Sequence, residues 1–337
     1  MSTDERLPTD KAAETKDADA TAAAAVQGLS IVARTQGQLV RRRFFRHRGA
    51  MVSLTILVLV VLLAYTSIGF AGIPGWWIWN YYTPGKVVNR GAPTLSLWPT
   101  FLGGDGFAIG LHPFGQDDLG RDYFALTMRG AQISLMIAFV VGIVATFIGV
   151  VIGALAGFYR GWVEGGLMRF TDVMITIPIL VIAAVLGQKF GGAGPLVLAV
   201  VIGLVAWTGL ARLIRGEFLS LREKEFVEAA RALGAKPTRI IFKHILPNTV
   251  GVITVAATLL VANAILLETA LSFLGFGVRA PDTSLGLLVS SYQNAFSTRP
   301  WLFWWPGLLI ITIALTVNFI GDGLRDAFDP RQNRVRA

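Results

Sequence analysis

The sequence predicts an all-α integral membrane protein with about six transmembrane helices. Hydrophobic residues make up 54% of the 337 residues and charged residues 15%, whereas a soluble domain carries about 25% charged residues. Six apolar segments approach or exceed the roughly 20 residues needed to cross a bilayer. Positive charge gathers between alternate segments. This composition excludes a disordered chain and argues against a soluble globular enzyme.

Residues 1–48 are predicted to form a disordered cytoplasmic tail that ends in a basic cluster. The first part is rich in alanine, threonine, aspartate and lysine. It contains no long apolar run, which argues against a signal peptide. The basic cluster before the first apolar segment consists of Arg41, Arg42, Arg43, Arg46 and Arg48.

The apolar segments define the rest of the organisation. They cover residues 51–71, 133–158, 167–186, 195–211, 250–274 and 302–320. We therefore predict a first transmembrane helix at 49–72, an extracytoplasmic Trp-rich insert at 73–132, a core domain at 133–324 and a cytoplasmic C-terminal tail at 325–337. Within the core domain, a water-exposed helical loop covers residues 212–248.

Charge predicts the orientation of the spans. If the first span begins in the cytoplasm, 23 of the 30 lysines and arginines fall on the cytoplasmic side and seven outside. This asymmetry is the positive-inside pattern and places both termini in the cytoplasm. It also accounts for the net charge of +9 without nucleic acid as a partner.

Several side chains within the spans suggest packing or bending. Small residues recur at every fourth position of the second span, at 145, 149, 153 and 157, and predict close helix packing. Pro178 predicts a kink in the third span. Asp172 lies three residues after Arg169, which is the spacing of a local ion pair.

Three further polar side chains fall within predicted spans. Glu268 either faces an aqueous cavity or reaches the interface, and the sequence leaves both open. Asn263 and Asn318 are deeper and are candidates for interhelical hydrogen bonds. This set is too sparse for a proton relay.

The Trp-rich insert offers two features. Its aromatic residues are more typical of an interfacial belt than of a substrate-binding surface. An acidic cluster could be a metal site, a docking patch or a turn with local ion pairs, and the last of these is favoured. The cluster consists of Asp117, Asp118, Arg121 and Asp122. A second such group, Asp322, Arg325, Asp326 and Asp329, is expected to cap the last span at the cytoplasmic surface.

The helical loop is the most informative segment. Residues 223–233 favour a helix with an apolar face, which consists of Phe226, Ala229, Ala230 and Leu233. Gly234 is predicted to end this helix, and Pro237 to begin a second one that stops before Pro247. The apolar content is high for an exposed loop, which favours a docking surface for a partner.

This loop resembles the "EAA" signature of ABC importer permeases. The resemblance rests on Glu228, Ala229 and Ala230, then Gly234, then the Leu246–Pro247 pair. His244 stands where that family usually has isoleucine, a variant similar to the oligopeptide and dipeptide branch. Segments 112–122, 268–277 and 318–330 also resemble the "C" subunit type of that branch, and the resemblance covers about residues 43–330.

The resemblance implies a function and a set of partners. It implies a permease subunit of the cell membrane that forms half of a pathway for imported peptides. It further implies a second permease, ATP-binding subunits and an extracytoplasmic binding protein as partners. It assigns docking of the ATPase to the seven loop residues Glu228, Ala229, Ala230, Gly234, His244, Leu246 and Pro247. ATP and magnesium would be bound by the partner ATPase and no cofactor by this chain, and the substrate-binding residues stay unknown.

The residues themselves argue against catalysis by this chain. A Gly-x-x-x-x-Gly-Lys-[Ser/Thr] loop, a His-Glu-x-x-His pair and cysteine are all missing from the sequence. We therefore expect neither a catalytic nor a metal site. The alternative functions are an ion-coupled secondary transporter or channel that acts without an ATPase, and a membrane scaffold. The first would require an ion relay or internal repeats with broken helices.

Overall fold

The computed structural model describes residues 36–96 and 106–329. The chain falls into two units, residues 1–42 and 43–337, and the second holds the helical bundle. Most of the predicted N-terminal tail lies outside the described residues, as does the end of the C-terminal tail. From Gln36 onward the tail is helical. The first elements are α2 (Gln36–Arg46), α3 (Arg48–Ser67), β1 (Gly69–Phe70), β2 (Ile73–Pro74) and η1 (Asn89–Gly91).

Four helices in the described part of the chain are long and apolar enough to cross a membrane, and two bent pairs raise the number to six if each counts as one span. The single spans are α3, α4 (Tyr123–Tyr159), α11 (Leu246–Phe273) with the short elements before it, and α13 (Trp301–Phe328). The pairs are α5 (Gly161–Thr176) with α6 (Ile179–Phe190), and α7 (Pro195–Gly203) with α8 (Thr208–Arg222). The six predicted segments fall on these helices and pairs.

The bend between α5 and α6 is much sharper than a kink. The two helices meet at 82°, and Pro178 occupies the junction as the residue before α6. Proline lacks the N–H that would continue the ladder, and it disfavours helical backbone at the preceding residue, here Ile177. Ile177 is accordingly extended, with φ −89° and ψ 124°. The bend predicted at Pro178 is therefore confirmed, and it is sharp enough to divide the span into two helices.

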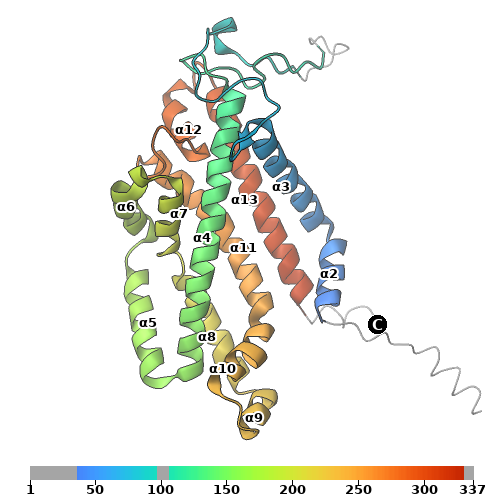
Figure 1. Ribbon diagram of the computed structural model, residues 1–337, viewed down its shortest axis with the longest axis vertical. Helices are drawn as coiled ribbons and strands as arrows, with labels where there is room; N and C mark the ends of the chain where they lie inside the picture. The colour runs from blue at the N-terminus through green and yellow to red at the C-terminus, as the bar shows by residue number, and fades with distance from the viewer. Residues whose placement is uncertain (1–35, 97–105, 330–337) are drawn as a thin grey trace, which may run out of the picture. The chain divides into compact units, whose positions relative to one another are not determined.

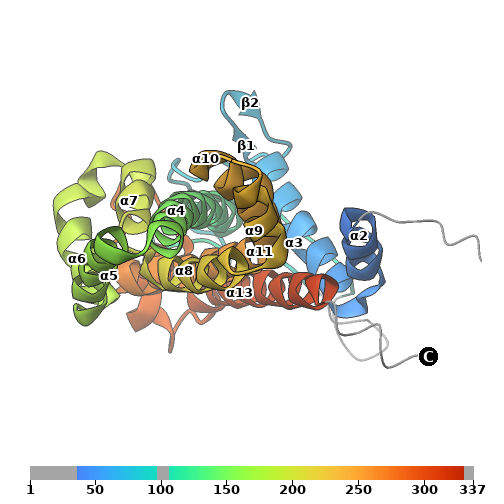
Figure 2. The ribbon, with the colours of Figure 1, turned by 90° about the horizontal axis from the view of Figure 1, so that it is seen from below.

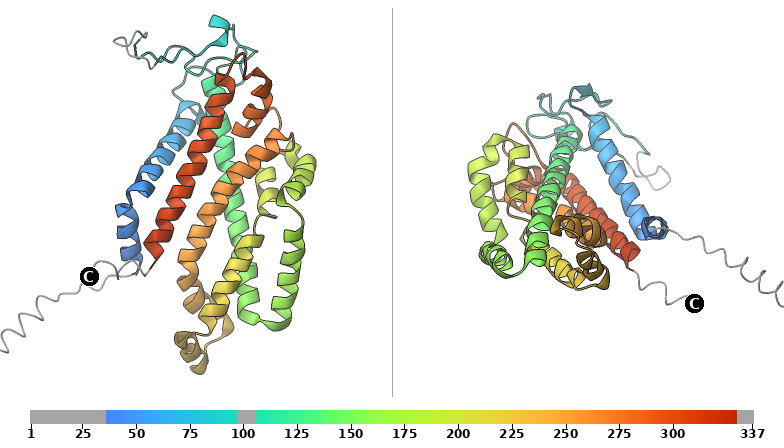
Figure 3. Two further views of the ribbon diagram at one scale, coloured as in Figure 1. Left: turned by 180° about the vertical axis from the view of Figure 1, so that it is seen from behind. Right: turned by 60° about the horizontal axis from the view of Figure 1, so that its bottom comes forward.

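Helix α4 is the central element of the bundle. It lies between α5, α6 and α7 on one side and α3, α11 and α13 on the other (Figure 1, Figure 2). Seen from behind, α13 runs beside both α3 and α11 (Figure 3). The largest apolar core joins α4 to these neighbours and includes Met128, Ile137, Ile202, Ile265 and Ile313.

The small residues of α4 form its contact with α8. A Cβ atom on Gly153 would lie 2.5 Å from the carbonyl oxygen of Ala211, and one on Gly157 would lie 2.6 Å from the Cβ of Phe218. No side chain larger than hydrogen fits at these distances without moving the helices. The predicted packing stripe is therefore confirmed.

Helix α4 begins ten residues before the predicted start of the second span, so the insert ends earlier than 132. Asp122 caps the helix by accepting a hydrogen bond from the backbone N–H of Ala125 at 2.8 Å. The extra turns are buried against the segment at the start of α12 (Leu285–Tyr292), where Gly130 approaches Leu285. Tertiary packing thus stabilises the first turns of α4, although Arg129 and Gln132 make this stretch less hydropathic than the predicted span.

Candidate functional site

The helical loop lies at one end of the bundle and consists of short helices that lead directly into α11 (Figure 1). Its elements are α9 (Glu225–Ala232), α10 (Pro237–Arg239) and the π-helical turn η4 (Ile240–Ile245). Gly234 separates α9 from α10 with φ +77°, the left-handed backbone that glycine accepts without strain. The predicted turn is therefore confirmed.

The prediction that Pro247 ends the second helix is wrong. Pro247 lies in the first turn of α11, and the helical path continues through it. The π-helical turn explains why, since the N–H of Leu246 reaches back five residues to the carbonyl of Ile241. With hydrogen bonds in this shifted register, the helix continues through Pro247 although proline has no backbone N–H to donate.

Apolar side chains on the inner side of the loop anchor it to the bundle. Val227, Ile240 and Ile245 are buried in one cluster with Ile214 and Phe218 of α8. The cluster also reaches α4 and α11. Movement of the loop is therefore coupled by packing to three membrane helices.

Several apolar side chains of the loop are exposed. Leu233 is 88% exposed, Phe242 68% and Phe226 41%. Of the predicted apolar face, Phe226, Ala229 and Leu233 point outward, whereas Ala230 is buried. The loop thus presents an exposed apolar surface on α9, which we call the outer loop surface: Phe226, Ala229 and Leu233. Phe242 is exposed as well but lines the groove between the membrane helices.

The seven loop residues assigned to docking divide by burial. Glu228, Ala229, Gly234 and Pro247 are exposed, His244 and Leu246 are partly buried, and Ala230 is buried. The exposed members could touch a partner directly. Ala230 instead supports α9 from beneath.

Ion pairs fix the neighbouring helices at the same end. Arg160 binds Glu223 at 2.9 Å, and the Nε of Arg215 on α8 donates to Glu164 on α5 at 2.8 Å. Asp172 binds Arg212 of α8 at 2.5 Å. The predicted local pair of Asp172 with Arg169 is therefore wrong, because a partner on an adjacent helix takes the carboxylate.

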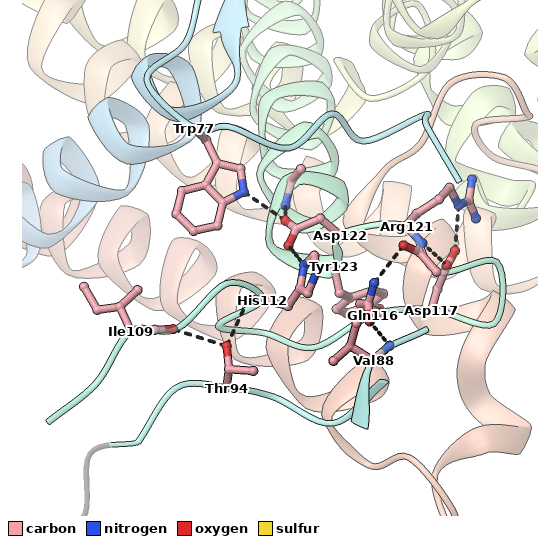
Figure 4. Close-up of polar contacts among 12 residues, drawn as sticks. Trp77, Val88, Thr94, Ile109, His112, Gln116, Asp117, Arg121, Asp122 and Tyr123 are labelled. Atoms are coloured by element: carbon pink, nitrogen blue, oxygen red, sulfur yellow. Dashed lines mark hydrogen bonds and ion pairs between the residues drawn. The ribbon is translucent and has the colours of Figure 1, made fainter. Parts of the chain in front are cut away.

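At the opposite end, Asp122 organises the insert (Figure 4). Its carboxylate lies 2.7 Å from Nδ1 of His112 and accepts a hydrogen bond from Nε1 of Trp77 at 3.0 Å. Both oxygens of one buried carboxylate are thus engaged by the insert and by the cap of α4. Trp77 also packs on Phe124 of α4, with ring centroids 4.7 Å apart, so this tryptophan is partly buried against the main bundle core.

Asp117 forms a second buried centre a few residues away (Figure 4). It accepts hydrogen bonds from the backbone N–H of Leu119 and of Arg121, from Nε of Arg121 at 2.6 Å and from the hydroxyl of Tyr292 at 3.1 Å. Burial, and then the adjacent carboxylate, raise the pKa of the Tyr292 hydroxyl, so it stays a donor. Among residues 36–96 and 106–329, His, Asp and Glu form no group of three placed to hold a metal ion. For Asp117 and Arg121, the turn interpretation of the acidic cluster is confirmed by their ion pair and by the turn hydrogen bonds of Asp117, whereas Asp118 pairs with the distant Arg299.

Glu268 is enclosed by serines and faces neither a cavity nor the interface. Its carboxylate accepts hydrogen bonds from Ser134 of α4 at 3.0 Å and from Ser272 at 2.7 Å. Ser134 in turn accepts the backbone N–H of Leu285 at 3.1 Å, and Ser284 caps α12. The network joins α4, α11 and α12.

An apolar groove runs along the bundle between α3, α4, α11 and α13, with a volume of about 880 Å³. Its lining includes Phe139 and Ile143 of α4 and Thr254 and Val261 of α11. Neither the Asn263 nor the Asn318 side-chain amide makes a hydrogen bond within the described residues, so their interhelical hydrogen bonds stay predictions. Asn263 is exposed on α11, on a face that does not line the groove.

Comparison with known proteins gives consistent matches over most of the chain. Residues 149–334 match the family described as binding-protein-dependent transport system inner membrane component. Residues 35–86 match the N-terminal TM domain of oligopeptide transport permease C.

Relatives of similar length share more than a third of the sequence. The oligopeptide transport system permease protein OppC of Escherichia coli K12 is 38% identical over 304 residues, which cover 90% of this chain and 94% of that protein. OppC of Haemophilus influenzae is 35% identical over 306 residues, 91% and 92% of the two chains. OppC of Mycobacterium bovis is 35% identical over 299 residues, 88% and 96% of the two chains.

A solved structure shares the fold. The inward-facing MetNI methionine ABC transporter superposes with a TM-score of 0.50 at 22% identity, over 60% of this chain and 96% of that one.

Proposed function

The chain belongs to the binding-protein-dependent inner membrane components of ABC importers, and on this premise we propose that its helical loop docks the ATP-binding subunits. The chain is a multi-pass permease subunit of the inner membrane and is not an enzyme. The proposal concerns which surfaces meet which partners. It rests above all on the outer loop surface.

The outer loop surface has the properties of a docking site. Leu233 and Phe226 would be costly to leave in water, and an exposed apolar patch commonly marks an interface. Glu228 and Arg231, which lie on the same short helix, are exposed beside it and would supply a polar rim. The seven docking residues therefore divide into exposed contact residues and the supporting Ala230, His244 and Leu246.

The inner side of the loop supplies the coupling. Val227, Ile240 and Ile245 share one core with α4, α8 and α11. A closing ATPase dimer that pushed α9 would therefore move these helices together, because packed cores shift between discrete arrangements and deform little. The membrane helices would then alternate between inward-open and outward-open states.

We propose that the groove between α4 and α11 faces the second permease and the pathway. Its walls are apolar and come from α3, α4, α11 and α13. A helix of the second permease packed into this groove would bury these walls. Asn263 is exposed on another face of α11, and because polar groups at membrane depth are costly unless they face protein or water, we expect a partner or water there as well.

At the opposite end, we propose that the insert receives an extracytoplasmic binding protein that delivers peptides. The peptide substrate follows from the names of the relatives, which are oligopeptide permeases. Among the described residues of the insert, Asp117 and Asp122 tie Arg121, Trp77 and His112 together. A platform held together by such contacts lowers the entropic cost of docking. ATP and magnesium would be bound by the partner ATPase, and both termini would lie in the cytoplasm.

Affinity purification from native membranes tests the proposal. The tagged chain is extracted in mild detergent, and all retained proteins are identified. We expect a second multi-span permease, one or two ATP-binding subunits and a binding protein, which can then be screened with peptides. Recovery of the chain alone or as a homo-oligomer, in a detergent shown to preserve such complexes, would contradict the proposal and point to a transporter without an ATPase.

A further inference from the structure

The end of α2, the start of α3 and the end of α13 form a pocket rich in basic side chains. It has a volume of about 520 Å³ and lies apart from the helical loop and the groove. Its lining consists of Arg43, Arg46, His47, Arg48, Gly323, Asp326 and Ala327. The contact that brings α3 and α13 together here is tight, because a Cβ on Gly323 would lie 2.3 Å from that of Ala50.

The pocket keeps an excess of positive charge. The guanidinium of Arg43 donates to the carbonyl of Asp329 at 2.9 Å and so holds the end of α13. Asp326 lies 3.4 Å from Nε2 of His47 and is the one carboxylate among the lining residues. Arg46 and Arg48 are exposed, and neither side chain forms an ion pair or hydrogen bond within the part of the chain that the structure describes.

The depth of the pocket matches the head-group layer of a membrane. Arg48 is the first residue of a membrane-spanning helix, and Val52 and Ile56 of that helix are exposed apolar residues one and two turns further in. Basic side chains thus lie at the level where phosphate groups occur, directly beside a surface suited to acyl chains. A guanidinium group can bind a phosphate through two parallel N–H···O hydrogen bonds.

We propose that this pocket binds the head group of an anionic phospholipid. Arg46 and Arg48 would hold the phosphate, and the acyl chains would run along Val52 and Ile56 of α3. Basic pockets between transmembrane helices are known sites for such head groups. A bound lipid would bridge the first span and the last, and the site is independent of the docking surfaces proposed above.

Native mass spectrometry tests this site on the full chain with its bound partners. The protein is reconstituted in nanodiscs of equal phosphatidylglycerol and phosphatidylcholine, released, and the lipids that stay bound are counted. We expect phosphatidylglycerol to be retained in preference. Each of Arg46→Gln and Arg48→Gln should weaken its binding about five-fold, the contribution of one basic side chain near an anionic surface. Asp326→Asn should strengthen it, because the opposing charge is gone.

Controls separate the pocket from general charge effects. Arg169→Gln removes one exposed arginine of α5 outside the pocket and should leave lipid retention unchanged. Equal retention in Arg46→Gln, Arg48→Gln and the original protein would overturn the proposal, as would an equal loss in Arg169→Gln. Displacement of the lipid by millimolar inorganic phosphate would also overturn it, by marking a site for a soluble anion. If the glutamine variants unfold, the increase expected for Asp326→Asn decides.

Discussion

Truncation of Leu233 is the most informative single change, because this side chain is almost fully exposed yet lies on the surface proposed to dock the ATPase. Its 88% exposure means that nearly the whole side chain is available for burial in a partner. Full burial of a leucine is worth about 1.5–3 kcal/mol. Leu233→Ala should therefore cost about 1–2 kcal/mol of docking free energy, which is roughly a 5- to 30-fold loss of affinity. The folded chain should lose less than about 0.5 kcal/mol.

The assay measures how much ATP-binding subunit is retained by the tagged chain after extraction and washing. Leu119→Ala is the matched control, since Leu119 is 58% exposed at the opposite end. It makes the same chemical change away from the loop and should leave retention unchanged. Ile245→Ala should instead lower the stability of the fold, by about 2–5 kcal/mol, because Ile245 is buried. Unchanged retention in Leu233→Ala would refute the assignment of the outer loop surface.

Three further predictions follow from the structure. Glu228→Lys should abolish uptake while membrane insertion stays normal, because it reverses an exposed charge at the docking rim; normal uptake would contradict the assignment. Gly153→Ala should cost about 1–3 kcal/mol, seen as a lower melting temperature in detergent, because its Cβ meets a backbone oxygen at 2.5 Å; Gly216→Ala, with open space around it, should not lower that temperature. Asp122→Ala should cost about 2–4 kcal/mol and speed protease cleavage of the insert, because it leaves Trp77 without its acceptor; an unchanged cleavage rate would argue against Asp122 as the organising residue.

The sequence predicted those features that depend on local pattern. The apolar segments, the Gly234 turn and the small-residue stripe on α4 each follow from residue type and spacing within one helix or loop. The structure agrees with these predictions because the spacing of apolar and small residues along a helix determines which of its faces is buried. Pro178 likewise indicated a bend, although an angle of 82° depends on where α6 and α7 pack.

The features missed by the sequence are contacts between distant segments. Asp172 pairs with Arg212, forty residues away, and nothing in its local spacing favoured that arginine over Arg169. Trp77 reaches Asp122 across 45 residues, so a tryptophan expected in an interfacial belt instead donates a hydrogen bond and packs against the bundle core.

Packing and hydrogen-bond register also placed two helix boundaries away from their predicted positions. The start of α4 extends beyond its apolar segment because α12 covers it. Pro247 fails to end a helix because a π-helical turn precedes it. Both effects depend on packing and hydrogen-bond register, which hydropathy does not report.

The central claim is that the helical loop binds the ATP-binding subunit, and cross-linking from this loop tests it most directly. The chain contains no cysteine, so Leu233→Cys creates a single attachment point for a thiol-directed photo-cross-linker in native membranes. We predict that Leu233→Cys captures an ATP-binding subunit and that Leu119→Cys, labelled to the same extent, does not. Capture of the ATPase from both positions equally, or from neither while it still co-purifies with the chain, would contradict this account of the loop.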